Sequence, residues 1–226
     1  MQHPIISMVK TVCKQYGVRF IMHRGIGNAL GGFDEGARTL HMYTRYTRQK
    51  GRRRGKPRVE YATDTEILMT AIHEMTHMCQ WKRSDVGWHQ LSEVHNERMS
   101  DLILLYAAGE KYYNKADLYE SALTLARLEF EAEITSIRIM ELFGEPHARA
   151  NATRNAKAYA ASFLVLALTG IMIRGRQYAM WHKYLSNSLI FDIDGQTLRK
   201  LCDIAIANRD LSYTIWDGKI CIKSTW

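Results

Sequence analysis

The chain has 226 residues, a formal net charge of +8 and 46% hydrophobic residues. Such a chain can bury a sizeable core, so we expect one domain or a domain with an added lobe. Its longest apolar run, Ala160 to Ile173, is too short for a membrane span, which favours a buried helix. The first residues show no basic segment followed by an apolar stretch, so we expect no secretory signal and a cytoplasmic location.

The first predicted elements form a small sheet that precedes a helix. Ile5 to Tyr16 favours a helix, and Val18 to His23 and Arg38 to Tyr43 favour strands. Four glycines between the two strands indicate a turn: Gly25, Gly27, Gly31 and Gly32. Thr63 to Glu66 reads as a capping box that opens a helix from about Asp64 to Trp81.

The second half of the chain is predicted to be helical. Further helices are expected over Leu91 to Ala108, Lys115 to Phe143, Arg149 to Thr169, Gln177 to Leu185 and Gln196 to Ala207. The tail predicts a hairpin, Ser212 to Ile215 and Lys219 to Ile222, turned by Asp217-Gly218. The order predicts an α+β fold with a small N-terminal β-sheet, a helical C-terminal lobe and a C-terminal β-hairpin. We expect a core over residues 1–145 and a helical extension over residues 146–226, packed as one unit with it.

The positive charge is concentrated in one segment. Seven basic residues lie between Arg48 and Arg58, alongside Gly51, Gly55 and Pro57, which predicts a solvated loop. Such a loop could contact nucleic-acid phosphates or an acidic substrate. A basic surface loop with no dedicated partner is at least as good an interpretation.

Cysteine spacing argues against a disulfide framework and against a cysteine zinc site. The four cysteines, Cys13, Cys79, Cys202 and Cys221, show no CxxC spacing and have apolar neighbours. We therefore expect reduced, mostly buried thiols.

The most informative motif is His73-Glu74-Met75-Thr76-His77, an HExxH pattern within the helix predicted from Asp64. A four-residue spacing places His73 and His77 on one helix face, where two imidazoles can bind one Zn²⁺. Glu74 lies about 100° around the helix. The alternative is a helix that carries two histidines for packing or surface reasons.

A catalytic zinc site needs a third protein ligand and an open position for water. On the helix from Lys115, Glu129 falls within an apolar stripe, and Glu133 lies about 40° away on the same face. A carboxylate within an apolar stripe is costly unless it binds a metal or accepts strong hydrogen bonds. Glu133 could orient a metal-bound histidine. Glu131 points the opposite way on the wheel, where Arg127 is an i,i+4 partner.

Histidines outside the motif compete for the ligand role. His95 shares a helix face with Leu91 and Leu102, so it also points inward. His89 is the weaker candidate, because its neighbours indicate a loop. We favour Glu129 over His95, and His95 over His89.

These residues resemble a known family. His73-Glu74-x-x-His77-x-x-Gln80-Trp81, the segment Glu129 to Glu133 and Asn155 to Tyr159 look like zincin metallopeptidases of bacteriophages and mobile elements. ImmA/IrrE-type peptidases show a similar Glu-x-x-Ala pattern, which implies Glu129 as a gluzincin-like ligand. This chain has a longer insert before Glu129. It is also partly similar to SprT-like proteases of DNA-bound proteins, in which a histidine such as His95 would be the ligand.

The resemblance and the motif together predict a zinc metallopeptidase with a zincin-like core. His73, His77 and Glu129 would hold Zn²⁺, Glu74 would be the general base, and Tyr159 is a candidate second donor to the oxyanion. The substrate would be a protein or peptide. Two alternatives remain: a zinc-stabilised module that binds a host factor without cleaving it, and a SprT-like protease acting on DNA-bound proteins.

Overall fold

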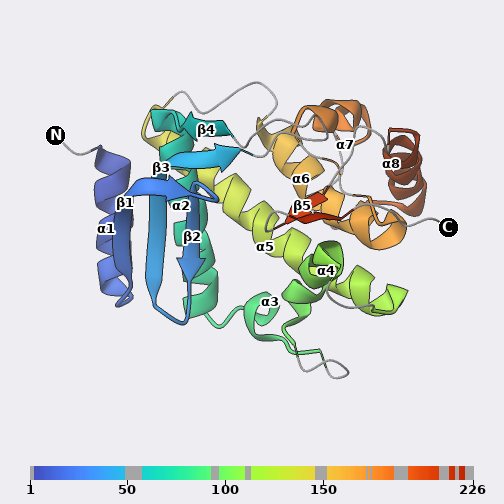
Figure 1. The fold of residues 1–226 in the computed structure, drawn as a ribbon, viewed down its shortest axis with the longest axis horizontal. Helices are drawn as coiled ribbons and strands as arrows, with labels where there is room; N and C mark the ends of the chain where they lie inside the picture. Colours follow the sequence, from blue (N-terminus) through green and yellow to red (C-terminus); the bar gives the residue numbers. More distant parts are fainter. Residues whose placement is uncertain are drawn as a thin grey trace. The chain divides into compact units, whose positions relative to one another are not determined.

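The structure is a computed structural model of the chain (Figure 1). It describes residues 3–48, 58–92, 97–109, 113–145, 152–171, 173, 175–185, 193–208, 214–216 and 219–221. The chain folds as two compact units. Unit 1 consists of Met1–Asp85 and Glu131–Ala152, and unit 2 of Val86–Phe130 and Thr153–Trp226. One boundary between the units, after Phe130, falls inside a helix, and the expected core over residues 1–145 stays a prediction.

Unit 1 is a four-stranded sheet with helices packed against it. Its elements are α1 (Pro4–Gln15), β1 (Arg19–Gly27), β2 (Gly31–Asp34), β3 (Thr39–Arg48), β4 (Arg58–Tyr61), α2 (Asp64–Lys82) and the end of α5 (Lys115–Leu142). The strand β3 is central: β1 pairs with it in parallel, and β2 and β4 pair with it in antiparallel fashion. Figure 1 shows α1 and α2 beside these strands.

The core of unit 1 follows from strand alternation. Leu40 and Met42 of β3 point to the same face and are fully buried, and they pack with Ile5 and Val9 of α1 and with Ile72 of α2. The opposite face of the sheet carries His41, which stacks on His23. The alternation of β3 therefore holds α2 against the sheet and fixes which of its residues face the strands.

The four glycines that predict a turn lie in two strands, and the chain reverses between Gly27 and Gly31. Gly25 and Gly27 belong to β1, and Gly31 and Gly32 belong to β2. Gly27 leaves room for an aromatic ring, because an added Cβ would lie 2.6 Å from Cγ of Tyr43. The predicted chain reversal is confirmed, because β1 runs parallel and β2 antiparallel to β3, and Gly27 in addition permits close packing.

Unit 2 is mainly helical. Its elements are α3 (Val86–His89), α4 (Met99–Ala108), the first part of α5, α6 (Ala152–Thr169), the 3-10 helix η1 (Gly175–Met180), α7 (His182–Leu185), α8 (Gly195–Ala207) and a hairpin of β5 (Thr214–Trp216) and β6 (Lys219–Cys221). The predicted C-terminal hairpin is confirmed by the antiparallel pairing of β5 with β6. The mixed sheet of unit 1 and the helices of unit 2 together confirm the predicted α+β class.

One predicted helix is shorter than expected. The pattern from Leu91 to Ala108 predicts continuous helix, whereas α4 begins only at Met99. Leu91 instead forms an isolated antiparallel bridge with Arg98. The backbone N–H of Met99 donates to the carbonyl of Gln90 at 2.8 Å, which closes a loop ahead of the helix. The predicted end at Gly109 is confirmed, because this residue adopts φ 75°, a left-handed conformation that suits glycine.

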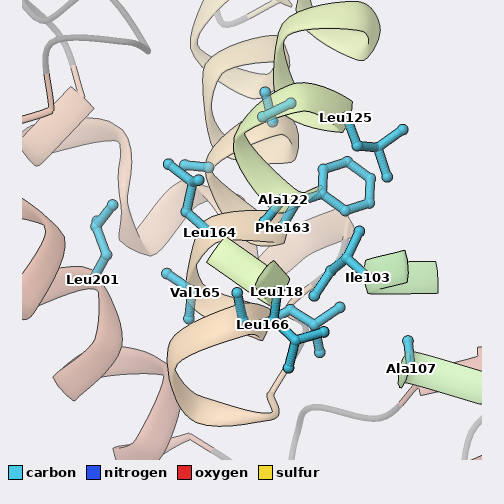
Figure 2. Packing of buried hydrophobic residues seen from close by; sticks show 14 of the residues in the cluster. Ile103, Ala107, Leu118, Ala122, Leu125, Phe163, Leu164, Val165, Leu166 and Leu201 are labelled. Carbon is cyan, nitrogen blue, oxygen red and sulfur yellow. The ribbon is translucent and has the colours of Figure 1, made fainter. Parts of the chain in front are cut away.

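The core of unit 2 is built around α5 and α6. Leu118, Ala122 and Leu125 of α5 pack with Phe163 and Leu166 of α6, as Figure 2 shows. Helix α6 is buried along most of its length, which confirms a core helix for the apolar run as far as Thr169, where the helix ends. Among the described residues, no helix combines the length and the apolar character needed to cross a membrane.

We predict that Gly31→Ala destabilises unit 1 by about 1–3 kcal/mol, because overpacking displaces its neighbours. An added Cβ at Gly31 would lie 2.8 Å from Cγ2 of Thr70 and 2.9 Å from Sδ of Met42. Gly32→Ala is the matched control, since nothing lies within 4 Å of a Cβ added there. Urea unfolding of both variants measures the difference. Equal stabilities would contradict the close packing of β2 on α2.

Candidate metal centre

The helix α2 carries the two motif histidines, and its sequence explains its start. Thr63 accepts a hydrogen bond from the backbone N–H of Glu66 at 3.2 Å, and the Glu66 carboxylate accepts from the Thr63 N–H at 2.8 Å. The predicted capping box is therefore confirmed. The helix then runs for 19 residues without a break, which places His73 and His77 one turn apart on one face.

The two imidazoles face each other through their Nε2 atoms. The Nε2 atoms of His73 and His77 lie 2.9 Å apart, and the rings meet edge to face with centroids 4.6 Å apart. His77 is buried, with 7% of its surface exposed, and His73 is partly buried. Both nitrogens that could bind a metal ion therefore point to the same place.

The structure also brings Glu129 to this pair. Each of His73, His77 and Glu129 offers one possible ligand atom, and these atoms all lie within 4.8 Å of one another. Glu129 is carried by α5, a continuous helix of 28 residues, and stands two residues before Glu131, where the chain re-enters unit 1. The three residues predicted as ligands from the sequence therefore form a group that could hold a metal ion.

The chemistry of these donors fits zinc. Two neutral imidazoles and one carboxylate form the ligand set of several catalytic zinc sites, in which a fourth position is left for water. Nitrogen ligands at about 2.0–2.1 Å from one ion, in tetrahedral geometry, stand about 3.3 Å apart. The 2.9 Å separation of the two Nε2 atoms needs to widen by only a few tenths of an ångström.

Glu74 lies beside the histidines and against the sheet. It follows His73 directly, is partly buried, and its Cγ would lie 3.2 Å from a Cβ added at Gly31 of β2. A glycine at this point of β2 lets the strand approach the Glu74 side chain closely. The side chain predicted to carry the general base thus runs close to β2.

Glu133 lies beside the predicted ligand His73, near the ring nitrogen that faces away from His77. Its Oε1 lies 3.5 Å from Nδ1 of His73. A carboxylate at this nitrogen fixes the ring orientation and raises the basicity of the nitrogen that binds metal. The sequence-based expectation that Glu133 orients a histidine agrees with this position.

Glu131 differs from the sequence-based expectation. The helical wheel predicts that it points away from the motif and pairs with Arg127. In the structure it accepts hydrogen bonds from two residues at the end of α2, from Arg83 at 2.7 Å and from Gln80 at 3.0 Å. Burial opposes ionisation of this carboxyl, but the hydrogen bonds from Arg83 and Gln80 outweigh it and lower the pKa of Glu131 below its usual value. Glu131 is thus part of the surroundings of the motif.

Gln80 joins Glu131 to the motif, and sequence reasoning missed its role. Its side chain is fully buried, and its Oε1 lies 2.8 Å from Nδ1 of His77. The signal available in the sequence was the spacing, because residues 77 and 80 are neighbours on one helix face. Burial of an amide requires hydrogen-bond partners, and Gln80 has two: His77 on the same helix and Glu131 on α5.

The remaining candidates lie elsewhere or outside the described residues. His95 and the basic segment 49–57 lie outside them, and His89 is exposed in α3. Tyr159 packs in unit 2, where its ring meets Phe163 edge to face at 5.2 Å and Tyr178 at 6.5 Å. This packing accounts for the tyrosine, and its role as an oxyanion donor stays a prediction.

Three of the described cysteines, Cys13, Cys79 and Cys202, are free thiols, and their reduced state stays a prediction. Cys13 is buried, and Cys79 and Cys202 are partly buried. Burial raises the pKa of the Cys13 and Cys202 thiols to about 11 and also raises the pKa of Cys79. A metal ion binds the thiolate, so these raised values disfavour the three cysteines as ligands.

Comparison with known proteins does not place the chain in a family. No protein-family model, no curated protein and no solved structure matches it.

We predict about one zinc ion per chain by elemental analysis of protein purified with Zn²⁺. Binding to the native state stabilises it by mass action, so a strong chelator should lower the melting temperature and added Zn²⁺ should restore it. Metal-free protein whose melting temperature is unchanged by Zn²⁺ would contradict the zinc assignment.

We further predict that Glu129→Ala removes most of the zinc affinity, because it removes a ligand. Glu133→Ala should cost about ten- to a hundredfold, as is typical of residues that orient a ligand. Glu141→Ala is the control, since it removes an exposed carboxylate from the same helix. Competition with a chromophoric chelator measures each affinity. Zinc lost in His95→Ala and kept in Glu129→Ala would reverse the assignment.

Proposed function

We propose that this protein is a zinc-dependent metallopeptidase that hydrolyses a peptide bond in a protein or peptide. The observation that carries the proposal is the convergence of His73, His77 and Glu129, with ligand atoms within 4.8 Å of one another. Glu74 adjoins this group on α2, and Glu133 lies against the far nitrogen of His73. The three proposed ligands, the candidate base and the orienting carboxylate all come from two helices, α2 and α5.

We assign a different role to each of the four carboxylates near the histidines. Glu129 would bind the ion together with the imidazoles, and Glu133 would orient His73. Glu131 is engaged by Arg83 and Gln80, so it is committed to the end of α2. Glu74 is left as the carboxylate for proton transfer, because it neighbours the ligand His73 and sits on a different side of α2.

Bound zinc supplies a Lewis acid that acidifies a coordinated water and polarises a carbonyl group. The chain provides the proton transfers. The Glu74 carboxylate would accept the proton of the attacking water and return it to the leaving amine, which makes one residue both base and acid in turn. Tyr159 remains our candidate for a second oxyanion donor, and Tyr159→Phe would remove its hydroxyl while keeping its packing in unit 2.

The resemblance to phage and mobile-element zincins supports the same reaction class, and we place the protein in the cytoplasm on the same grounds. A zinc-stabilised module without activity would use the same ligands and would need no base. The Glu74 variant therefore separates the two functions.

We predict that Glu74→Gln retains zinc and stability while peptide hydrolysis falls by a factor on the order of 10²–10⁴, because an amide cannot accept the proton. Zinc content, melting temperature and cleavage of an unfolded protein substrate are measured on the same preparations. Glu66→Gln is a control on the same helix, in the capping box, and should affect stability alone. Full cleavage by Glu74→Gln would exclude Glu74 as the base, and wild-type protein that binds zinc and cleaves nothing would favour the binding module.

A further inference from the structure

Four residues of unit 1 form a chain of hydrogen bonds that ends at a predicted ligand. Arg83 contacts Oε1 of Glu131 at 2.7 Å, Oε2 of Glu131 accepts from Nε2 of Gln80 at 3.0 Å, and Oε1 of Gln80 lies 2.8 Å from Nδ1 of His77. The chain leads from the partly exposed end of α2 to the buried Gln80 and His77.

The direction of each hydrogen bond follows from the charge at its outer end. A carboxylate paired with a guanidinium only accepts hydrogen bonds, and Oε1 of Glu131 lies 2.7 Å from the Arg83 guanidinium. The amide of Gln80 must therefore turn its NH₂ group toward Glu131 and its oxygen toward His77. An amide oxygen also only accepts, so Nδ1 of His77 must carry the hydrogen in this contact.

The opposite orientation of the amide is disfavoured by like charge. A rotated Gln80 would point its oxygen at the Glu131 carboxylate and its NH₂ group at Nδ1 of His77. The hydrogen of a neutral His77 would then lie on Nε2, the nitrogen that faces His73. A nitrogen that carries a hydrogen has no lone pair for a metal ion.

We propose that Glu131 and Gln80 are positioning residues that hold His77 in the tautomer with hydrogen on Nδ1 and none on Nε2, the nitrogen that lies 2.9 Å from Nε2 of His73. This inference rests on the proposed function for its purpose, which is zinc binding through Nε2. Its structural content concerns the protein alone, because the same hydrogen bonds set the tautomer before any metal binds.

The variant Glu131→Gln tests the direction of these hydrogen bonds. It keeps the size of the side chain, but its amide can donate as well as accept, so Gln80 is free to rotate. In metal-free protein, ¹⁵N chemical shifts of the imidazoles should show His77 moving from the Nδ1–H form to a mixture of both tautomers. Zinc affinity, measured by chelator competition, should fall about tenfold, at the low end of the effect of residues that orient a ligand.

The double variant Gln80→Glu with Glu131→Gln is the sharpest control. A carboxylate at position 80 accepts from Nδ1 of His77 and from the amide at position 131, which restores the original direction. Tautomer and zinc affinity should return to near wild-type values. Glu141→Gln makes the same chemical change at an exposed site of α5 and should alter neither.

Two results would overturn the inference: an unchanged His77 tautomer in Glu131→Gln, or a double variant that stays as weak in zinc binding as the single one. Thermal unfolding of each variant confirms that the fold is retained. If wild-type protein binds no zinc while the tautomer still switches in Glu131→Gln, the proposed function fails and the positioning role stands.

Discussion

The inability of a carboxylate to donate a hydrogen bond is the constraint on which the surroundings of the site depend. Arg83 and Glu131 are both partly exposed, with 55% and 41% of their side-chain surface accessible, so their ion pair contributes only about 0–1 kcal/mol to stability. The ion pair matters more for the direction of the hydrogen bonds than for stability, because it determines which end of the buried Gln80 amide faces Glu131. A weak surface interaction can therefore define the chemical state of a buried imidazole.

Three glutamates of α5, spaced two residues apart, lie near the motif histidines or the end of α2. Glu129, Glu131 and Glu133 follow one another along one continuous helix, so each is turned about 200° from the one before. Glu133 reaches His73, and Glu131 reaches the end of α2 one turn beyond His77. A helix can serve two points on its neighbour in this way because glutamate is long and flexible.

Local features were predictable from the sequence. The capping box at Thr63, the length of α2, the end of α4 at Gly109 and the C-terminal hairpin all follow from patterns within a few residues. The grouping of Glu129 with the motif histidines was also predictable, because an acid in an apolar stripe demands a partner.

Features that depend on distant residues were missed. The strand β2 was not predicted, because Gly31 is explained by its close approach to Thr70 of α2 and Met42 of β3. The partner of Glu131 was misassigned because a helical wheel gives the direction of a side chain and says nothing about which residues of another helix it can reach. The sequence pattern includes Gln80, but its role was missed because its two partners, His77 and Glu131, lie on different elements.

The two units have separate cores that share one helix. Leu118, Ala122 and Leu125 of α5 belong to the core of unit 2, whereas Met140 of the same helix belongs to the core of unit 1. If either core melts, half of α5 loses its packing, and isolated helices of about 12–15 residues are only marginally stable in water. Unwinding would then advance along α5 toward Glu129, near the boundary. The part of α5 that carries Glu129 therefore keeps its helical form only while the cores that pack on this helix stay folded.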